Sequence, residues 1–446
     1  MDYQQSLDYM SGLLMFGIRF GTDRFKQLLA QVGNPHSQLR AAHIAGTNGK
    51  GSTTAMIASI MRSAGYKVGG YYSPYVFDVR ERILVDGQPI PKEDFSRWVT
   101  LLKSHIEALE KTEFGETTEF ELKTAVAFCY FAEQQVEFAS VEVGMGGRLD
   151  ATNVITPRVS IITNVGLDHT ERLGKTHAEI AYEKAGIIKP DVPVITAVAN
   201  PEALQVVEQV AGERNAPLIK VMHREGSPPD HEVWWSFGKD PNTVVVRLNG
   251  VELQLAHPRL PGSYQGSNVA CAVAAAFELR SSSDLSVPPE AIELGIRNAW
   301  LPGRFHLVSR EPLVILDGAH NTDAAQALAE AIKLQYGSRR LTLILGMVQN
   351  HDPSGVIEAL CPLADEIILT QPDNSRALPV EFLVEEANRQ KFSFKVENSV
   401  SAAVAKAFEK ASPEDVILIT GSFYTIGDVS VAEIASQNGT YTGFVQ

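Results

Sequence analysis

The stretch AAHIAGTNGKGS at residues 41–52 decides the fold. Its apolar first half predicts a buried strand, and residues 52–64 carry a helical pattern that Gly65 ends. The glycines between them let backbone N–H groups converge on a phosphate, the helix N-terminus adds partial positive charge, and Lys50 reaches the outer phosphates. The stretch departs from the GxxxxGK(S/T) pattern, because Ile44 replaces the first glycine and Gly51 separates Lys50 from Ser52. We predict a nucleotide phosphate loop at residues 46–52.

Outward from this loop, apolar runs alternate with helical patterns, which predicts an α/β protein with a mostly parallel sheet. A second α/β series begins after residue 300, where Leu301-Pro302-Gly303 breaks the pattern. We therefore expect two domains, at residues 1–299 and 300–446. Strands are expected at 41–45, 67–72, 138–143, 159–163 and 192–196, as antiparallel strands within 225–260, and near 313–316, 341–345, 366–369 and 416–420.

The composition of the 446 residues excludes several classes of protein. A net charge of −14 disfavours a duplex nucleic-acid binder, which normally carries a basic stripe. Three cysteines, none in a CxxC pair, predict neither a disulfide framework nor a thiolate zinc site. Residues 1–9 lack a signal-peptide layout, and no apolar run approaches the ~18 residues of a membrane span. We expect a cytoplasmic protein that binds neither nucleic acid nor membrane.

Three polar residues lie near other expected strand ends. Glu142 ends the apolar run 138–143, and His169 follows the strand at 159–163. In parallel sheets ligands gather at the carboxyl ends of strands, so both side chains are candidates to hold a divalent cation beside the phosphates. Taken alone, His169 fits a loop histidine equally well, and Lys184 fits a helix-surface lysine better than a functional one.

Further candidates are the arginines at 80–82 and Arg148, since the guanidinium fork grips carboxylates and phosphates, although loop arginines are also commonly just solvated. In the second half, Arg304 and the run DGAHN at 317–321 place an acid, a histidine and an amide at one strand end. The glycine cluster 144–147 fails the dinucleotide fingerprint. A GxSxG nucleophile elbow is missing, which argues against a Ser-His-Asp hydrolase.

These motifs together resemble the folylpolyglutamate synthase and dihydrofolate synthase family of the Mur ligase superfamily. The resemblance covers nearly the whole chain and includes GTNGKGS at 46–52, YSP at 72–74, RERI at 80–83, GRLDATN at 147–153, LPGR at 301–304 and DGAHN at 317–321. It implies a Mur-ligase-like P-loop ATPase domain with a mostly parallel sheet, followed by a smaller Rossmann-like α/β domain. The family often carries Asp-Lys-Asp where this chain has Asn350-His351-Asp352, so no lysine role is assigned there.

The resemblance also implies site residues. Mg²⁺ would be held by Ser73, Glu142 and His169, and Lys184 would be carbamylated. Catalysis would involve Lys50, Lys184, Arg304 and His320. The nucleotide would be bound by Gly46, Thr47, Asn48, Gly49, Lys50, Gly51, Ser52, Asn268, Arg304 and Asp317. The other substrates would be bound by Arg82, Gly17, Ile18, Arg19, Phe20, Thr118, Glu119, Phe120, Glu121, Leu149, Asp150 and Ala151.

The implied reaction is an ATP-dependent ligation of L-glutamate to a folate-type carboxylate through an acyl phosphate, with dihydropteroate or a reduced folate as acceptor. We expect ATP and Mg²⁺ as cofactors and a monomeric enzyme. Two alternatives stay open. One is another amino-acid ligase of the Mur superfamily, of which the cell-wall Mur ligases are the nearest rivals; these usually have Thr directly after the loop lysine, where this chain has Gly51. A nucleotide-dependent switch would not need the cluster at 317–321, and ATP hydrolysis measured with and without folate and glutamate separates it from a ligase.

Overall fold

The computed structural model describes residues 1–446 except 18, 20, 241–242, 257, 259–261, 263, 282–283, 350, 433 and 435–446. The chain forms two compact units. The first comprises Met1–Pro74, Val79–Pro258 and Gly266–Ala299, and the second comprises Tyr75–Asp78, Arg259–Gln265 and Trp300–Gln446. The segment Tyr75–Asp78 therefore belongs to the second unit, although the residues before and after it in the sequence belong to the first.

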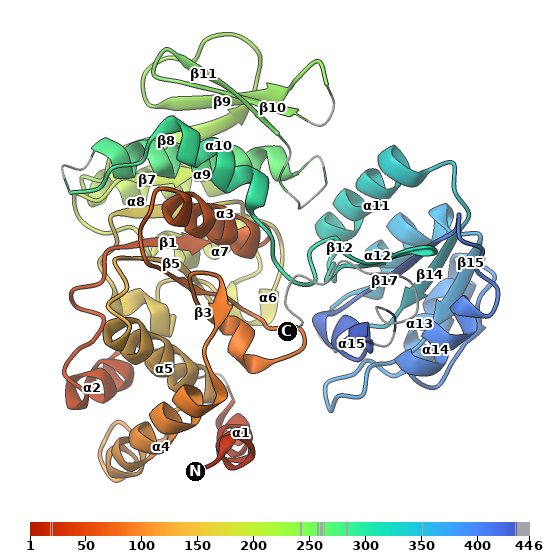
Figure 1. Ribbon diagram of the computed structural model, residues 1–446, viewed down its shortest axis with the longest axis horizontal. Helices are drawn as coiled ribbons and strands as arrows, with labels where there is room; N and C mark the ends of the chain where they lie inside the picture. Colours follow the sequence, from red (N-terminus) through yellow and green to blue (C-terminus); the bar gives the residue numbers. More distant parts are fainter. Residues whose placement is uncertain are drawn as a thin grey trace. The chain divides into compact units, whose positions relative to one another are not determined.

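The described residues of the first unit form an eleven-stranded sheet (Figure 1). Its order is β11-β10-β9-β8-β7-β6-β1-β5-β2-β3-β4. The central strands are short, fully buried and parallel, as expected for strands covered on both faces. The bounds are β1 Ala41–Ala45, β2 Val68–Tyr71, β3 Ile83–Val85, β4 Gln88–Pro89, β5 Phe138–Glu142, β6 Val159–Ile162, β7 Val194–Thr196, β8 Leu218–His223, β9 Glu232–Phe237, β10 Thr243–Leu248 and β11 Val251–Ala256.

Helices cover this sheet, and α1, α2, α4 and α5 gather together as one group (Figure 1). Helix α5 is buried along nearly its whole length, and the capping box between Thr118 and Glu121 fixes its start. The bounds are α1 Tyr3–Gly12, η1 Leu13–Phe16, α2 Asp23–Gln31, α3 Lys50–Ser63, η2 Val79–Arg82, α4 Lys92–Leu109, α5 Glu119–Glu133, η3 Ala151–Val154, α6 Thr170–Leu173, α7 His177–Ala185, α8 Pro201–Glu213, α9 Gln265–Ser281 and α10 Pro289–Asn298, where η marks 3₁₀ helices.

The second unit is a smaller α/β layer structure around a six-stranded sheet, ordered β12-β13-β17-β14-β15-β16 in the described residues. Strand β12 runs antiparallel to β13, and the others are parallel. The strands are β12 His306–Arg310, β13 Leu313–Leu316, β14 Leu341–Leu345, β15 Glu366–Leu369, β16 Lys395–Val396 and β17 Val416–Thr420. The helices are α11 Thr322–Tyr336, α12 Pro353–Leu360, η4 Cys361–Leu363, α13 Val380–Arg389, α14 Val400–Phe408 and α15 Phe423–Gly427.

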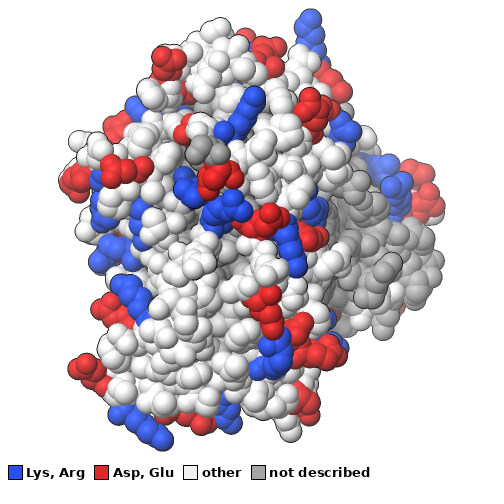
Figure 2. Space-filling model, turned by 60° about the vertical axis from the view of Figure 1, so that its left-hand side comes forward, with Lys and Arg blue, Asp and Glu red and all other residues white. Residues whose placement is uncertain are grey.

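The predicted α/β class, a mostly parallel sheet plus a smaller second sheet, is confirmed. In the predicted antiparallel region at 225–260, β10 is antiparallel to both β9 and β11, whereas β9 pairs with β8 in parallel. Across the described residues, no helix is both long and apolar enough to cross a membrane. Figure 2 shows acidic and basic side chains intermixed on the visible face.

Candidate active site

The predicted site of the first unit lies where four neighbouring parallel strands end. In the order β6-β1-β5-β2, Ile44 of β1 is in register with Glu142 of β5, and Ala45 with Ile162 of β6. The phosphate loop follows β1, Ser73 follows β2, Glu142 ends β5, and the loop to His169 follows β6. The structure therefore brings these sequence-predicted residues to one edge of the sheet, where ligands of parallel sheets bind.

Two glycines of the phosphate loop are required by its shape. Gly46 has φ +155°, and a Cβ there would lie 1.9 Å from the Thr163 hydroxyl oxygen. Gly49, with φ +81°, is the N-cap of α3. The Lys50 ammonium donates hydrogen bonds of 3.0 Å to the carbonyls of Gly46 and Thr47, so its charge lies within the curve of the loop. A loop of this form presents amides and a cation to an anion.

Residues that the sequence did not indicate brace this loop. The Asn164 side-chain oxygen accepts hydrogen bonds from the backbone N–H groups of Thr47 and Asn48, at 3.0 and 2.8 Å. The Thr163 hydroxyl donates to the Asn48 carbonyl at 2.6 Å. Both residues directly follow β6, so their position after a predicted strand is the signal that could have identified them.

Asn268 of α9, a predicted nucleotide-binding residue, lies against the loop. A Cβ at Gly49 would come within 2.4 Å of the Asn268 side-chain oxygen. Asn268 is itself buried, so its amide is held close to the start of α3. This contact joins a residue far along the chain to the phosphate loop within the same unit.

The Glu142 carboxylate is only 1% exposed, and it accepts a 2.9 Å hydrogen bond from the backbone N–H of Ser73. A buried carboxylate is costly unless cations or donors compensate its charge, so a divalent cation suits this position. Carboxylate and hydroxyl oxygens are the ligands that Mg²⁺ prefers. Among the described residues, no group of three or more His, Cys, Asp or Glu side chains could hold a metal alone. The Glu142 carboxylate and the Ser73 hydroxyl therefore fit an ion that is also bound by phosphate oxygens.

His169 and Lys184 flank the same strand ends. His169 takes the left-handed conformation, with φ +50°, as the N-cap of α6, and its backbone N–H donates to the Asp168 carboxylate at 2.8 Å. Lys184, near the end of α7, is 3% exposed. Burial, together with the nearby Lys50 ammonium, lowers its pKa to about 7, opposed by the Asp168 charge. A buried lysine with this pKa is not the helix-surface lysine that sequence alone favours.

The three segments of the predicted substrate pocket also meet within the first unit. The Gly21 N–H donates to the Leu149 carbonyl at 3.4 Å, and Arg19 forms a 2.7 Å ion pair with Glu116. Phe120 packs against the backbone just after Glu142, because a Cβ at Gly144 would lie 2.4 Å from its ring. Ile18 and Phe20 lie outside the described residues.

Several predicted pocket residues have structural partners. Glu121 caps α5 with Thr118 and forms a 3.0 Å ion pair with Arg24, which sequence reasoning missed. Asp150 accepts hydrogen bonds from the backbone N–H groups of Met145 and Thr152, both at 3.0 Å, and burial raises its pKa. The remaining members have these positions: Gly17 ends η1 with φ +61°, Glu119 begins α5, and Ala151 is buried at the start of η3.

The predicted residues of the second unit gather at the ends of β13 and β17. Asp317 is buried and accepts hydrogen bonds from the backbone N–H groups of Phe305 and Ala319, at 2.8 and 2.9 Å. The Arg304 guanidinium carbon lies 4.2 Å from the centre of the Phe423 ring. His320 Nδ1 donates to the Gly318 carbonyl at 2.7 Å, which leaves the ring's lone pair at Nε2. The His320 ring also packs 4.7 Å from that of His351, which sequence reasoning left without a role.

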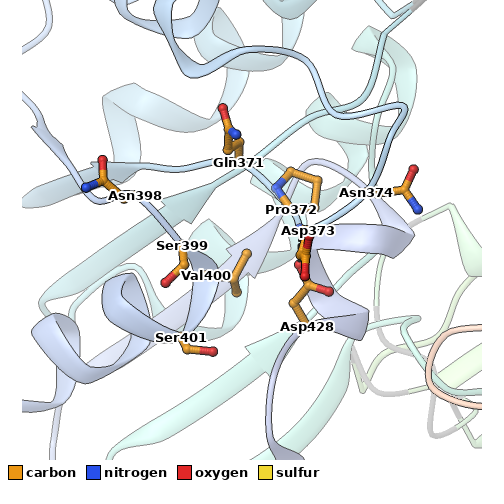
Figure 3. A pocket seen from close by; sticks show the side chains of 9 residues that line it. All are labelled: Gln371, Pro372, Asp373, Asn374, Asn398, Ser399, Val400, Ser401 and Asp428. Atoms are coloured by element: carbon orange, nitrogen blue, oxygen red, sulfur yellow. Dashed lines mark hydrogen bonds between the residues drawn. The ribbon is translucent and has the colours of Figure 1, made fainter.

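A pocket of about 460 Å³ lies elsewhere in the second unit, between the segment after β15 and the start of α14 (Figure 3). Two carboxylates line it, and the Asp373 backbone N–H donates to Asp428 at 2.7 Å. It contains none of the predicted site residues. Its lining is Gln371, Pro372, Asp373, Asn374, Asn398, Ser399, Val400, Ser401 and Asp428.

Comparison with known proteins matches two family models to this chain. Residues 44–276 match the Mur ligase middle domain, and residues 303–423 match the Mur ligase glutamate ligase domain. The dihydrofolate synthase/folylpolyglutamate synthase of Bacillus subtilis is 38% identical over 434 residues, covering 96% of this chain and 98% of that protein.

Two solved structures are similarly close. Escherichia coli FolC in complex with DHPP and ADP superposes with a TM-score of 0.85 at 32% identity, covering 98% of this chain and 99% of that one. A bifunctional folylpolyglutamate synthase/dihydrofolate synthase with Mn, AMPPNP and L-glutamate bound gives a TM-score of 0.83 at 29% identity, covering 97% and 98%.

Proposed function

This chain belongs to the folylpolyglutamate synthase and dihydrofolate synthase family of Mur ligases, ATP-dependent enzymes that join L-glutamate to a folate-type carboxylate, and we propose that it accepts both dihydropteroate and reduced folates. The observation that carries the proposal is the convergence of the phosphate loop, Ser73, Glu142 and the loop to His169 on one edge of the sheet, with Lys184 close enough to Lys50 and Asp168 for their charges to act on it. Two of the three pocket segments, 118–121 and 149–151, meet at Gly144 just after Glu142, which supports a place for dihydropteroate.

ATP and a divalent cation are the cofactors. The related structures hold ADP, or AMPPNP with Mn, and the buried Glu142 carboxylate has the chemistry that such an ion requires. We assign Ser73, Glu142 and His169 as its ligands, with a carbamate on Lys184 beside them. When bound, the ion neutralises charge on the phosphate oxygens. The pKa of about 7 supports the carbamate, because only a neutral amine adds CO₂.

The chemistry begins with transfer of the γ-phosphoryl group from ATP to the acceptor carboxylate, which gives an acyl phosphate and ADP. The α-amine of glutamate then attacks the acyl carbon, an amide forms, and inorganic phosphate leaves. Loop amides of residues 46–52 and the Lys50 ammonium stabilise charge on the transferring phosphoryl group. Asn268, Arg304 and Asp317 are assigned to the nucleotide.

The incoming amine must lose a proton when it attacks. His320 Nε2 carries the ring's lone pair, since Nδ1–H donates to the Gly318 carbonyl. We assign Nε2 as the group that orients the amine and receives this proton.

The test offers dihydropteroate and tetrahydrofolate separately, each with L-glutamate and Mg-ATP, and identifies the products by mass. We expect one added glutamate residue per ADP released with either acceptor. A product from only one acceptor would refute the dual activity. ATP hydrolysis that is independent of both acceptor and glutamate would refute the ligase assignment.

A further inference from the structure

One peptide group connects a buried arginine to the Glu142 carboxylate. The backbone N–H of Ser73 donates to Glu142 at 2.9 Å, and the carbonyl of the same peptide, that of Tyr72, accepts a 3.1 Å hydrogen bond from Arg82 Nε. Backbone pairing reinforces this contact, since the Tyr72 N–H donates to the Arg82 carbonyl at 3.0 Å. The arginine and the carboxylate therefore hold opposite ends of one peptide dipole.

Arg82 is 5% exposed, and its surroundings are aromatic. Its guanidinium carbon lies 5.2 Å from the centre of the Phe120 ring and 5.7 Å from that of Tyr71. Within the described part of the chain, Arg82 forms no ion pair with a carboxylate. The nearby carboxylate of Glu119 is instead paired with Lys123 at 2.6 Å.

A buried guanidinium without a carboxylate partner needs compensation from oriented dipoles and aromatic rings. The Tyr72–Ser73 peptide supplies it, because its carbonyl faces Arg82 while its N–H faces the negative charge of Glu142. Hydrogen bonds in such a chain polarise one another and strengthen together. The same peptide leads directly into Ser73, the assigned hydroxyl ligand of the cation.

We propose that Arg82 is a positioning residue that acts through the Tyr72–Ser73 peptide to fix Ser73 and Glu142 as metal ligands, and that it does not bind the substrate. This inference rests on the proposed function, since it concerns the assigned cation site. It replaces the substrate-binding role expected for Arg82 from sequence. Groups that orient metal ligands typically contribute about 10–100-fold to metal affinity.

The experiment titrates Mn²⁺ into the full-length protein saturated with AMPPNP and measures free Mn²⁺ by electron paramagnetic resonance. Arg82→Met removes both the charge and the hydrogen bond, and we expect its Mn²⁺ affinity to fall about 10–100-fold. At saturating metal, its KM for the folate acceptor should stay within about twofold of wild type. Arg80→Met is the matched control from the same short helix η2, where Arg80 stacks on Tyr3 at 5.7 Å, and it should leave Mn²⁺ affinity unchanged.

Unchanged Mn²⁺ affinity in Arg82→Met, with or without a raised KM for the folate acceptor, would overturn the proposal. If Arg82→Met does not fold, Arg82→Lys takes its place. Lysine keeps the charge but lacks the Nε–H donor. A weaker Mn²⁺ affinity at an unchanged KM for the folate acceptor would therefore support the proposal. An unchanged Mn²⁺ affinity with a raised KM for the folate acceptor would refute it. Glu142→Gln separates this inference from the proposed function, because undiminished Mn²⁺ affinity in that variant would refute the metal site itself.

Discussion

Replacement of Lys184 by alanine should lower ligase activity about 10–100-fold, the range seen when a group supporting a metal site is removed. The burial of the amine is what allows this lysine to form the carbamate. With a pKa of about 7, about three quarters of the Lys184 side chains are neutral at pH 7.5, against about one in a thousand for an ordinary lysine. Only the neutral amine reacts with CO₂, so this lysine forms a carbamate far more readily than an exposed one.

The assay measures ADP release with dihydropteroate, glutamate and Mg-ATP, first in CO₂-depleted buffer and then after addition of bicarbonate. Wild-type activity should fall on depletion and recover with bicarbonate, and the recovery should increase as pH rises through 7. A ¹³C carbamate resonance should form with labelled bicarbonate in the wild type and be missing in Lys184→Ala.

Lys189→Ala is the matched control. Burial lowers the pKa of Lys189 to about 8, and its ammonium donates to the Asn153 carbonyl at 2.8 Å, outside the assigned site. This variant should keep both the carbamate signal and the bicarbonate response. Full Mg²⁺-dependent activity in Lys184→Ala would refute the carbamate.

Three further predictions concern the phosphate loop, the second unit and the predicted substrate pocket of the first unit. Gly46→Ala places a Cβ 1.9 Å from the Thr163 hydroxyl, so nucleotide affinity measured by calorimetry should fall at least about tenfold; an unchanged affinity would contradict the loop geometry. Burial lowers the pKa of His306 to about 4, so the stability due to its neutral ring is complete above pH 6.5 and is lost as pH falls toward 4. Between pH 7 and pH 4.5 the free energy of unfolding of His306→Leu, measured by denaturant titration, should therefore decrease by about 2–3 kcal/mol less than that of the wild type. Equal decreases in the two proteins would refute the lowered pKa of His306. Thr118→Ala should lower the free energy of unfolding by about 1 kcal/mol through loss of the α5 cap, a decrease that is checked by denaturant titration and is contradicted by unchanged stability.

The sequence was sufficient for the parts of the site that depend on local pattern. A strand, a glycine-rich loop and a helix follow one another at residues 41–63, so the phosphate loop could be placed at the end of β1. Glu142 could be placed for the same reason, because an apolar run leads directly to it. Parallel pairing then brings the ends of neighbouring strands together.

The rest depends on contacts between distant segments. Asn164 braces the phosphate loop only because β6 pairs with β1, and Arg82 reaches the Tyr72 carbonyl only because β3 folds back on β2. A single sequence also does not show which lysines are buried, so Lys184 resembles any lysine near a helix end. Strands β3, β4 and β16, of two or three residues, are too short for a periodic signal.

Nucleotide binding by the Lys50→Ala variant tests the central claim most directly. Calorimetric titration of AMPPNP in the presence of Mg²⁺ should show binding to the wild type and an affinity at least about a hundredfold weaker for the variant, which corresponds to about 3 kcal/mol, while the free energy of unfolding stays the same. Equal affinities for the two proteins would contradict the assignment of residues 46–52 as the triphosphate site.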